Sequence, residues 1–231
     1  MTSCAIRAVL VWLSLSAVAW AQADVPLIDA VREGDLAQLQ ALLAQQADPN
    51  TADADGSTAL HWAAHRDDRV AAELLLRAGA RVGAANRYGA TALLTAATNG
   101  SAPMLELLLE AGADPNAGLP EGESPLMRTA RAGRADAVEV LLARGADVEA
   151  QEDWRAQTAL MWATVEGNTA AVQALIAGGA DVHARSRGGF TPLLFAVRHN
   201  QQDTARALVA AGADVDDQLP SGLSALALAT L

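Results

Sequence analysis

The sequence repeats itself, and the period of the repeat limits the possible folds more than any other feature. The heptad "TALHWAA" at 58–64 returns as "TALMWAT" at 158–164. Related heptads begin at positions 25, 58, 91, 124, 158, 191 and 224, so every spacing is 33 residues except one of 34. A second block, "LLLRAGARV" at 74–82, recurs in phase with the first. A period of this length indicates an array of small units that bury their apolar faces against one another.

Each unit carries the signals for two short helices. Thr58 and Ser124 stand where a side-chain oxygen can cap the first helix by accepting from a free backbone amide. Pro26, Pro125 and Pro192 fit the first helical position, where a missing N–H costs nothing. The second helix carries paired leucines and ends at a glycine suited to a left-handed C-cap. These glycines are Gly79, Gly112, Gly145, Gly179 and Gly212, and the turns between the two helices fall at Gly34, Gly100, Gly133 and Gly167.

The pattern resembles the ankyrin repeat family, whose units share this period and a T-P-L-H-x-A motif. The resemblance covers residues 25–231. It implies an all-α solenoid of helix-turn-helix repeats with β-turn fingers, in which the fingers and inner helices form a concave side that binds other proteins. We therefore expect a signal peptide at 1–23 and an ankyrin repeat array at 24–231, with the last unit incomplete.

The chain departs from the family pattern at several places. Only His61 keeps the motif histidine, which in the family ties one finger to the next, so the other joints should rely on apolar packing. We expect the extra residue of the fourth unit to fall in the stretch leading to the "EDWRAQ" finger (152–157). The fingers at 119–124 and 219–224 replace the usual aspartate with Leu-Pro. The seventh unit has no second helix, so we expect either a native chain that continues past Leu231 or a frayed C-terminus.

The composition narrows the class of partner. Hydrophobic residues make up 52% of the chain, which excludes a disordered protein. The formal net charge is −11, from 27 acidic residues and 16 basic residues that are all arginine. Because an acidic surface repels phosphate backbones and anionic lipid headgroups, we expect no nucleic-acid partner and no membrane binding after signal removal. We expect the protein to be a monomer.

Residues 1–23 have the features of a secretory signal peptide. Arg7 precedes an uncharged apolar run, and the following "AWAQA" supplies small residues for cleavage after Ala21 or Ala23. The apolar run is shorter than the roughly 20 residues of a membrane span, although an uncleaved anchor and a segment without a targeting role are alternatives. We expect an exported protein, either periplasmic or secreted. Cleavage would also remove Cys4, the only cysteine.

No combination of residues points to catalysis, a metal ion or a cofactor. His61 and His65 are four apart on an expected helix, but Trp62 stands where the zinc-protease pattern requires glutamate. The chain has no nucleophile-elbow serine motif, no phosphate-binding loop and no dinucleotide-binding glycine pattern. We therefore expect a protein that is not an enzyme and has no cofactor, with His61 as the structural histidine of the motif.

The candidate binding site lies on the fingers and on the rim of the inner helices. Tryptophan, tyrosine and arginine are the residue types enriched where proteins bind one another. The candidate partner-binding residues are Arg87, Tyr88, Arg131, Trp154, Arg155, Arg187, Phe190 and Arg198. Trp154 and Phe190 either bind a partner or pack sideways on adjacent fingers. Trp62, Trp162 and Phe195 are expected to pack against neighbouring inner helices rather than to line a groove.

Together these features predict a non-catalytic scaffold that binds another protein. Arg131, Arg155, Arg187 and Arg198 gather positive charge on one side of an acidic chain, which favours a partner with an acidic patch. Two alternatives stay open. The repeats form the binding half of a larger exported enzyme whose catalytic domain lies beyond residue 231, or the protein is a secreted effector directed at a host.

Overall fold

The structure is a computed structural model, and residues 26–229 are described. This part of the chain forms thirteen helices, six inner–outer pairs followed by the single helix α13, and no β-strand. The first helices of successive units, the inner helices, are α1 (Pro26–Glu33), α3 (Ala59–His65), α5 (Ala92–Asn99), α7 (Pro125–Ala132), α9 (Ala159–Glu166), α11 (Pro192–Arg198) and α13 (Ala225–Leu228). The second helices, the outer helices, are α2 (Leu36–Ala44), α4 (Arg69–Arg77), α6 (Ala102–Glu110), α8 (Ala135–Ala143), α10 (Thr169–Ala177) and α12 (Gln202–Ala210).

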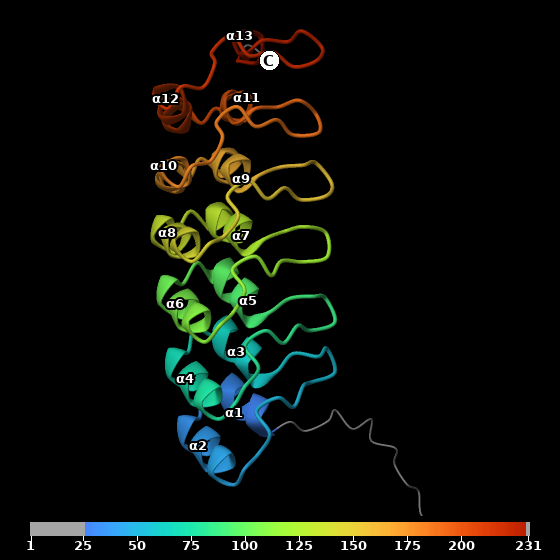
Figure 1. Cartoon of the computed structure of the whole chain (residues 1–231), viewed down its shortest axis with the longest axis vertical. Coiled ribbons are helices and arrows are strands. Elements are labelled where there is room, and N and C mark those ends of the chain that lie inside the picture. Colours follow the sequence, from blue (N-terminus) through green and yellow to red (C-terminus); the bar gives the residue numbers. More distant parts are fainter. Residues whose placement is uncertain (1–25, 230–231) are drawn as a thin grey trace, which may run out of the picture.

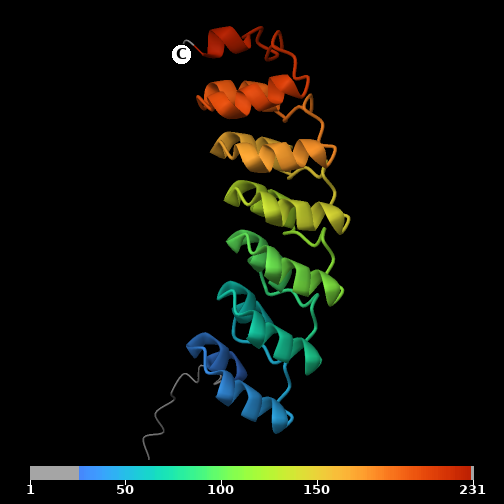
Figure 2. The same cartoon turned by 90° about the vertical axis from the view of Figure 1, so that its left-hand side faces the viewer.

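The units stack into an elongated, curved array. Figure 1 shows the inner helices in one column, the outer helices in a second column, and the fingers projecting to one side. Figure 2 shows that the direction of the helices changes gradually from unit to unit. Leucines at one motif position form the spine of the core, and Leu60, Leu93, Leu126, Leu160 and Leu193 are at most 3% exposed. We call the surface formed by the fingers and the inner helices the finger face.

The inner helices α5, α7, α9, α11 and α13 begin with the side-chain caps that the sequence predicts. The cap predicted at Thr58 is wrong, because its hydroxyl makes no hydrogen bond to a backbone amide of α3 and lies 2.9 Å from His61 Nδ1 instead. The Ser124 hydroxyl accepts from the Met127 amide at 3.3 Å, and the Thr191 hydroxyl accepts from the Leu194 amide at 3.4 Å. Proline occupies the first position of α1, α7 and α11. These caps fix where each inner helix starts relative to the finger before it, because the capping residue is the last residue of the finger loop.

Left-handed backbone ends the helices where glycine was predicted. Gly167 closes α9 with a φ of 74°, and Gly179 follows α10 with a φ of 95°. In the two units that have no glycine after the inner helix, Asp67 and Asn200 adopt φ values of 55° and 54°. Aspartate and asparagine tolerate this conformation better than most residues with a side chain.

The fingers are tight loops, and one of them is longer than the others. Five fingers are closed by an amide that donates to the carbonyl four residues later, as Asn86 does to Ala90 at 2.9 Å. In the remaining finger the closing bond runs from the Glu152 amide to the Gln157 carbonyl at 3.1 Å and spans five residues. The extra residue of the fourth unit therefore lies within the finger itself. The expectation that it falls in the stretch leading to this finger is wrong.

Proline interrupts the hydrogen bonds that join neighbouring fingers. Three backbone amides donate to a carbonyl of the preceding finger at 2.7 to 2.9 Å: Arg87 to Asp55, Asp153 to Glu121, and Arg187 to Arg155. Pro120 and Pro220 hold the equivalent place in the two Leu-Pro fingers, and proline has no N–H to donate. The third, fourth and fifth fingers therefore form a hydrogen-bonded set with a proline joint at each end.

Two expectations concern residues outside the described range. The signal peptide at 1–23 and the continuation past Leu231 both lie there. Between residues 26 and 229, no helix has the length and apolar character required to cross a membrane.

Candidate functional site

His61 shows how one finger is tied to the next. Its ring is 5% exposed, with Nδ1 3.1 Å from the Thr58 amide and Nε2 3.0 Å from the Ala90 carbonyl. Because the Thr58 N–H donates to Nδ1, the neutral ring carries its proton on Nε2 and donates it to Ala90. Burial lowers the pKa of His61 below its ordinary value of 6.5. At the equivalent position Met127 and Met161 are fully buried apolar side chains. The same fingers are also joined by backbone hydrogen bonds from Asp153 to Glu121 and from Arg187 to Arg155, so the expectation that these joints rely on apolar packing alone is wrong.

The position after this histidine carries large aromatic side chains on the finger face. Trp62 and Trp162 are half-buried and pack in part against the hydrophobic core, and Phe195 is 6% exposed. Each of the three also lines a pocket. The expected packing against the core is therefore confirmed, and the three side chains line pockets in addition.

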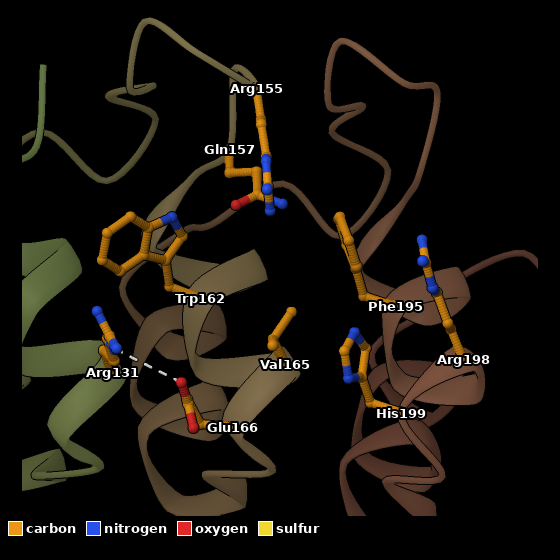
Figure 3. Close-up of a pocket in the computed structure, with 9 residues that line it drawn as sticks. All are labelled: Arg131, Arg155, Gln157, Trp162, Val165, Glu166, Phe195, Arg198 and His199. Atoms are coloured by element: carbon orange, nitrogen blue, oxygen red, sulfur yellow. Dashed lines mark ion pairs between the residues drawn. The ribbon is translucent and has the colours of Figure 1, made fainter. Parts of the chain in front are cut away.

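One pocket, which we call the arginine pocket, lies between α7, α9, α11 and the 152–157 finger. Its volume is about 330 Å³. Figure 3 shows Arg155 reaching from the finger toward the pocket, with Trp162 on one side and Phe195 and Arg198 on the other. The full lining is Arg131, Arg155, Gln157, Trp162, Val165, Glu166, Phe195, Arg198 and His199.

The arginine pocket is positively charged within an acidic protein. Arg131 Nε lies 3.5 Å from Glu166 Oε1, which is the ion pair drawn in Figure 3. Among the described residues, neither Arg155 nor Arg198 makes an ion pair. Two guanidinium groups of this cluster lie near aromatic rings: that of Arg131 is 5.7 Å from the Trp162 centroid, and that of Arg198 is 5.2 Å from the Phe190 centroid. Stacking of this kind limits the positions that the guanidinium group can take.

A second pocket, which we call the apolar pocket, adjoins the first. Its volume is about 410 Å³, and it is lined by Leu119, Glu121, Glu123, Glu152, Trp154, Arg155, Gln157 and Trp162. Glu123 is neutralised by Arg128, with Nε to Oε1 at 2.6 Å and Nη2 to Oε2 at 2.8 Å. The Glu152 carboxylate accepts from the backbone amides of its own finger, including Trp154 at 2.6 Å. Two of the three carboxylates are thus engaged, and Leu119, Trp154 and Trp162 supply apolar walls.

The structure brings most of the predicted site residues together. Arg131, Arg155 and Arg198 share the arginine pocket, and Trp154, 70% exposed, borders the apolar pocket. Arg187 supports the finger, since its Nη1 donates to the Trp154 carbonyl at 2.9 Å.

Phe190 packs on the inner helix that follows its own finger. Its ring stacks on Phe195 of the helix that follows it, with the ring centroids 5.0 Å apart and the planes inclined by 25°. Trp154 and Phe190 therefore differ: the first is open to solvent, and the second supports a wall of the arginine pocket.

Two predicted site residues lie apart from these pockets. Arg87 and Tyr88 belong to the second finger and line neither pocket. Arg87 pairs with Asp55, with Nη1 to Oδ1 at 3.3 Å, and Tyr88 is 62% exposed. Both are surface residues of the finger face at some distance along the array.

Leu119, Trp162 and Phe195 line the pockets but were not among the predicted site residues. One signal for the aromatic pair was available, because Phe195 precedes the predicted site residue Arg198 by three positions and Trp162 holds the equivalent place in α9, so each lies on the helix face that borders the rim. Leu119 had no comparable signal, since its side chain reaches the pocket from a finger of the preceding unit.

Comparison with known proteins decides the family. A sequence profile for ankyrin repeats in three copies matches residues 27–118 and again 126–219. The chain belongs to the ankyrin repeat family. The crystal structure of the human ASB11 ankyrin repeat domain is 30% identical, with a TM-score of 0.80 over 88% of this chain and 91% of that one. The ankyrin repeat domain of Bcl-3, a unique member of the IkappaB family, is 28% identical, with a TM-score of 0.79 over 90% of this chain and 95% of that one. No curated protein matches the chain.

Membership confirms the predicted fold and gives the general class of activity. Ankyrin repeats are protein–protein interaction modules, and ankyrin repeat domains are typically non-catalytic scaffolds. In residues 26–229, no three histidine, cysteine, aspartate or glutamate side chains are grouped so that they could hold a metal ion.

Proposed function

We propose that this ankyrin repeat protein is an exported, monomeric scaffold that binds another protein through the finger face of units 3 to 6. The observation that carries the proposal is the arginine pocket, which adjoins the exposed Trp154 side chain. Aromatic and arginine side chains beside a pocket are the usual anchors of protein–protein binding. The partner carries an acidic patch, because the pocket has two arginines without ion pairs in a protein of net charge −11.

The hydrogen-bonded set of fingers supports this location. The Asp153 amide donates to Glu121 and the Arg187 amide donates to Arg155, so the three fingers around the two pockets are held together. A surface that is ordered before binding loses less conformational entropy when the partner docks. Tight binding is therefore available without a cofactor or a large rearrangement.

The test is capture of the partner by variants of the finger face. Trp154→Ala combined with Phe190→Ala removes the exposed anchor and a wall of the arginine pocket, and we expect capture from the exported proteins of the source cell to fall at least tenfold. Helical content measured by circular dichroism should stay unchanged. The matched control is Val70→Ala with Val209→Ala, two exposed apolar residues on the outer helices α4 and α12. Equal capture by both double variants would overturn the site.

Export has a separate test. Amino-terminal sequencing of the protein isolated from the periplasm or the medium should begin at Gln22 or Asp24, as expected from cleavage after Ala21 or Ala23. An intact chain found in the cytoplasm would contradict export and leave the binding surface unaffected.

A further inference from the structure

We infer that the two adjoining pockets recognise a short, extended acidic segment of the partner. One aspartate or glutamate side chain enters the arginine pocket, and a large apolar side chain nearby in the same segment enters the apolar pocket. This inference rests on the proposed binding function and names the chemistry of the partner at that site.

Two guanidinium groups are free to bind the carboxylate. Arg155 descends from the finger and Arg198 rises from α11, so the pocket presents them from two different units (Figure 3). Neither has a carboxylate partner among the described residues, whereas Arg128 next to the apolar pocket is fully paired with Glu123. Guanidinium groups bind carboxylates through two parallel hydrogen bonds, and Arg198 is already oriented by the Phe190 ring.

An unused hydrogen-bond donor lies between the two pockets. The indole Nε1 of Trp162 is buried and has no hydrogen-bond partner. In unit 2 the equivalent Trp62 donates its Nε1–H to Asp53 Oδ2 at 3.2 Å. The finger that precedes Trp162, at the end of unit 4, has Glu152 in that place, and its carboxylate is occupied by three backbone amides of the longer finger. Among the described residues, the Trp162 donor is therefore left without an acceptor.

The geometry suits neighbouring side chains of one extended segment. Arg155, Gln157 and Trp162 line both pockets, so a single wall separates them. In an extended chain, side chains two residues apart point the same way and are separated by about 7 Å. A segment crossing this wall can place a carboxylate on one side, an apolar group on the other, and a carbonyl near Trp162 Nε1.

The same face at units 2 and 3 lacks this chemistry. The pocket there has a volume of about 200 Å³ and is lined by Ser57, His61, Trp62, His65, Asn86 and Thr95. It contains no arginine, and its tryptophan is already hydrogen-bonded to Asp53. The acidic segment should therefore bind only at units 4 to 6.

The experiment is selection from a library of random 12-residue peptides, displayed with amidated or buried C-termini, on the full chain as exported. We expect the selected peptides to share an aspartate or glutamate within three residues of a leucine, phenylalanine or tryptophan. Replacing that acid by its amide should weaken binding at least tenfold. Peptides without a shared acid, or no enrichment at all, would overturn the inference. Dependence on a free C-terminal carboxylate would overturn the assignment to a side chain.

Variants of the protein locate the site. Arg155→Ala with Arg198→Ala should weaken the selected peptide at least tenfold, and the lysine double variant should recover part of the loss. Arg69→Ala with Arg206→Ala changes the net charge equally on the outer helices and should alter affinity less than twofold. If both alanine double variants lost the same affinity for the peptide, the effect would come from the net charge of the protein, and the pocket assignment would be overturned.

The Trp162 indole gives a direct readout of the binding site. In ¹H–¹⁵N spectra assigned with single Trp→Phe variants, the peptide should shift the Trp162 indole resonance and leave that of Trp62 in place. If both stay unchanged while the native partner still depends on Trp154, the proposed scaffold function stands and this inference fails. If the native partner binds without Trp154 and Phe190, the proposed site itself fails.

Discussion

At the scale of single residues, a polar side chain at the start of a finger can bind the backbone amides of its own loop. Asp53 and Asn86 each accept from two backbone amides of their fingers through one side-chain oxygen. Glu152 accepts from three amides through its two carboxylate oxygens, and its longer side chain suits a finger with one more residue. The same substitution leaves Trp162 without the acceptor that Asp53 provides to Trp62. One side-chain exchange thus shapes both the finger and the binding pocket.

The motif histidine gives a prediction at this scale. His61→Met removes the hydrogen bonds to Thr58 and Ala90 but keeps a side chain that Met127 and Met161 accommodate at the same position. At pH 8 we expect the free energy of unfolding to fall by about 1–2 kcal/mol, the usual range for lost hydrogen bonds. Urea unfolding of both proteins measures this loss.

The loss should shrink in acid. The folded protein lowers the pKa of His61, so below the ordinary value of 6.5 the unfolded chain takes up a proton that the folded ring resists. The stability contributed by the neutral ring is complete above pH 6.5 and is lost as the pH falls toward the lowered pKa. The wild type therefore loses stability that the His61→Met variant never had. The difference in free energy of unfolding between the two proteins should be smaller at pH 5.5 than at pH 8. A gap that widens would contradict this account of His61.

At the scale of the elements, the joints between fingers are of two kinds. Where an amide is present, fingers are joined by backbone hydrogen bonds of 2.7 to 2.9 Å. Where Pro120 or Pro220 stands, the proline ring lies against a glycine of the preceding finger instead. In the Leu-Pro fingers, the backbone hydrogen bond to the preceding finger is therefore replaced by contact between the proline ring and a glycine of that finger, where a side chain would clash.

The ring contact can be measured with a matched pair of glycines. Gly89 and Gly79 have φ values of 80° and 92°, but a Cβ at Gly89 would lie 2.7 Å from Pro120 Cδ, whereas Gly79 faces open space. Left-handed backbone costs a residue with a side chain about 1–2 kcal/mol, so Gly79→Ala should destabilise by that amount. Gly89→Ala should lower the free energy of unfolding by clearly more than Gly79→Ala, because the added Cβ would also clash with Pro120.

Combining Gly89→Ala with Pro120→Ala tests the cause of that difference. We expect the double variant to lose no more stability than the two substitutions cost without the clash, because the proline ring is gone. Denaturant unfolding of the wild type, Gly89→Ala, Pro120→Ala and the double variant gives the coupling free energy. Additive costs would show that Gly89 is sensitive for another reason.

At the scale of the whole molecule, the array joins local units through contacts between neighbours. Each inner helix packs on the inner helices before and after it, as α7 does on α5 and α9. Folding of one unit is therefore supported by its neighbours, as in other repeat proteins. The binding pockets use this arrangement, because their walls come from three successive units.

A core substitution in the middle of the array should expose this connectivity. Leu141 in α8 is fully buried, and Leu141→Ala should cost about 2–5 kcal/mol, the range for leucine truncation in a core. Because the weakened unit lies between two intact groups of units, we expect urea unfolding followed by circular dichroism to become broader, with a lower apparent m-value. A transition of unchanged slope, shifted only in midpoint, would contradict local coupling.

The sequence by itself determined the period, the two helices of each unit, their caps and the family. These depend on residues close together in the chain: Ser124 caps the helix it precedes, and Gly167 ends the helix it follows. The role of His61 was predictable as well, because the resemblance to ankyrin repeats implied that this histidine ties one finger to the next. The positions of Arg131, Arg155 and Arg198 within their repeats also indicated that each of them lies at the surface.

Only the tertiary structure decided which of these residues meet. Arg131, Arg155 and Arg198 come from α7, a finger and α11, and their side chains share one pocket because three units stack in register. The surroundings of Trp162 depend on the 152–157 finger, which decides whether the indole N–H has an acceptor. The sequence placed the extra residue of that finger wrongly, so these surroundings could not be predicted. Periodicity fixes each residue within its own unit, whereas a pocket depends on side-chain directions across units, and those follow from packing.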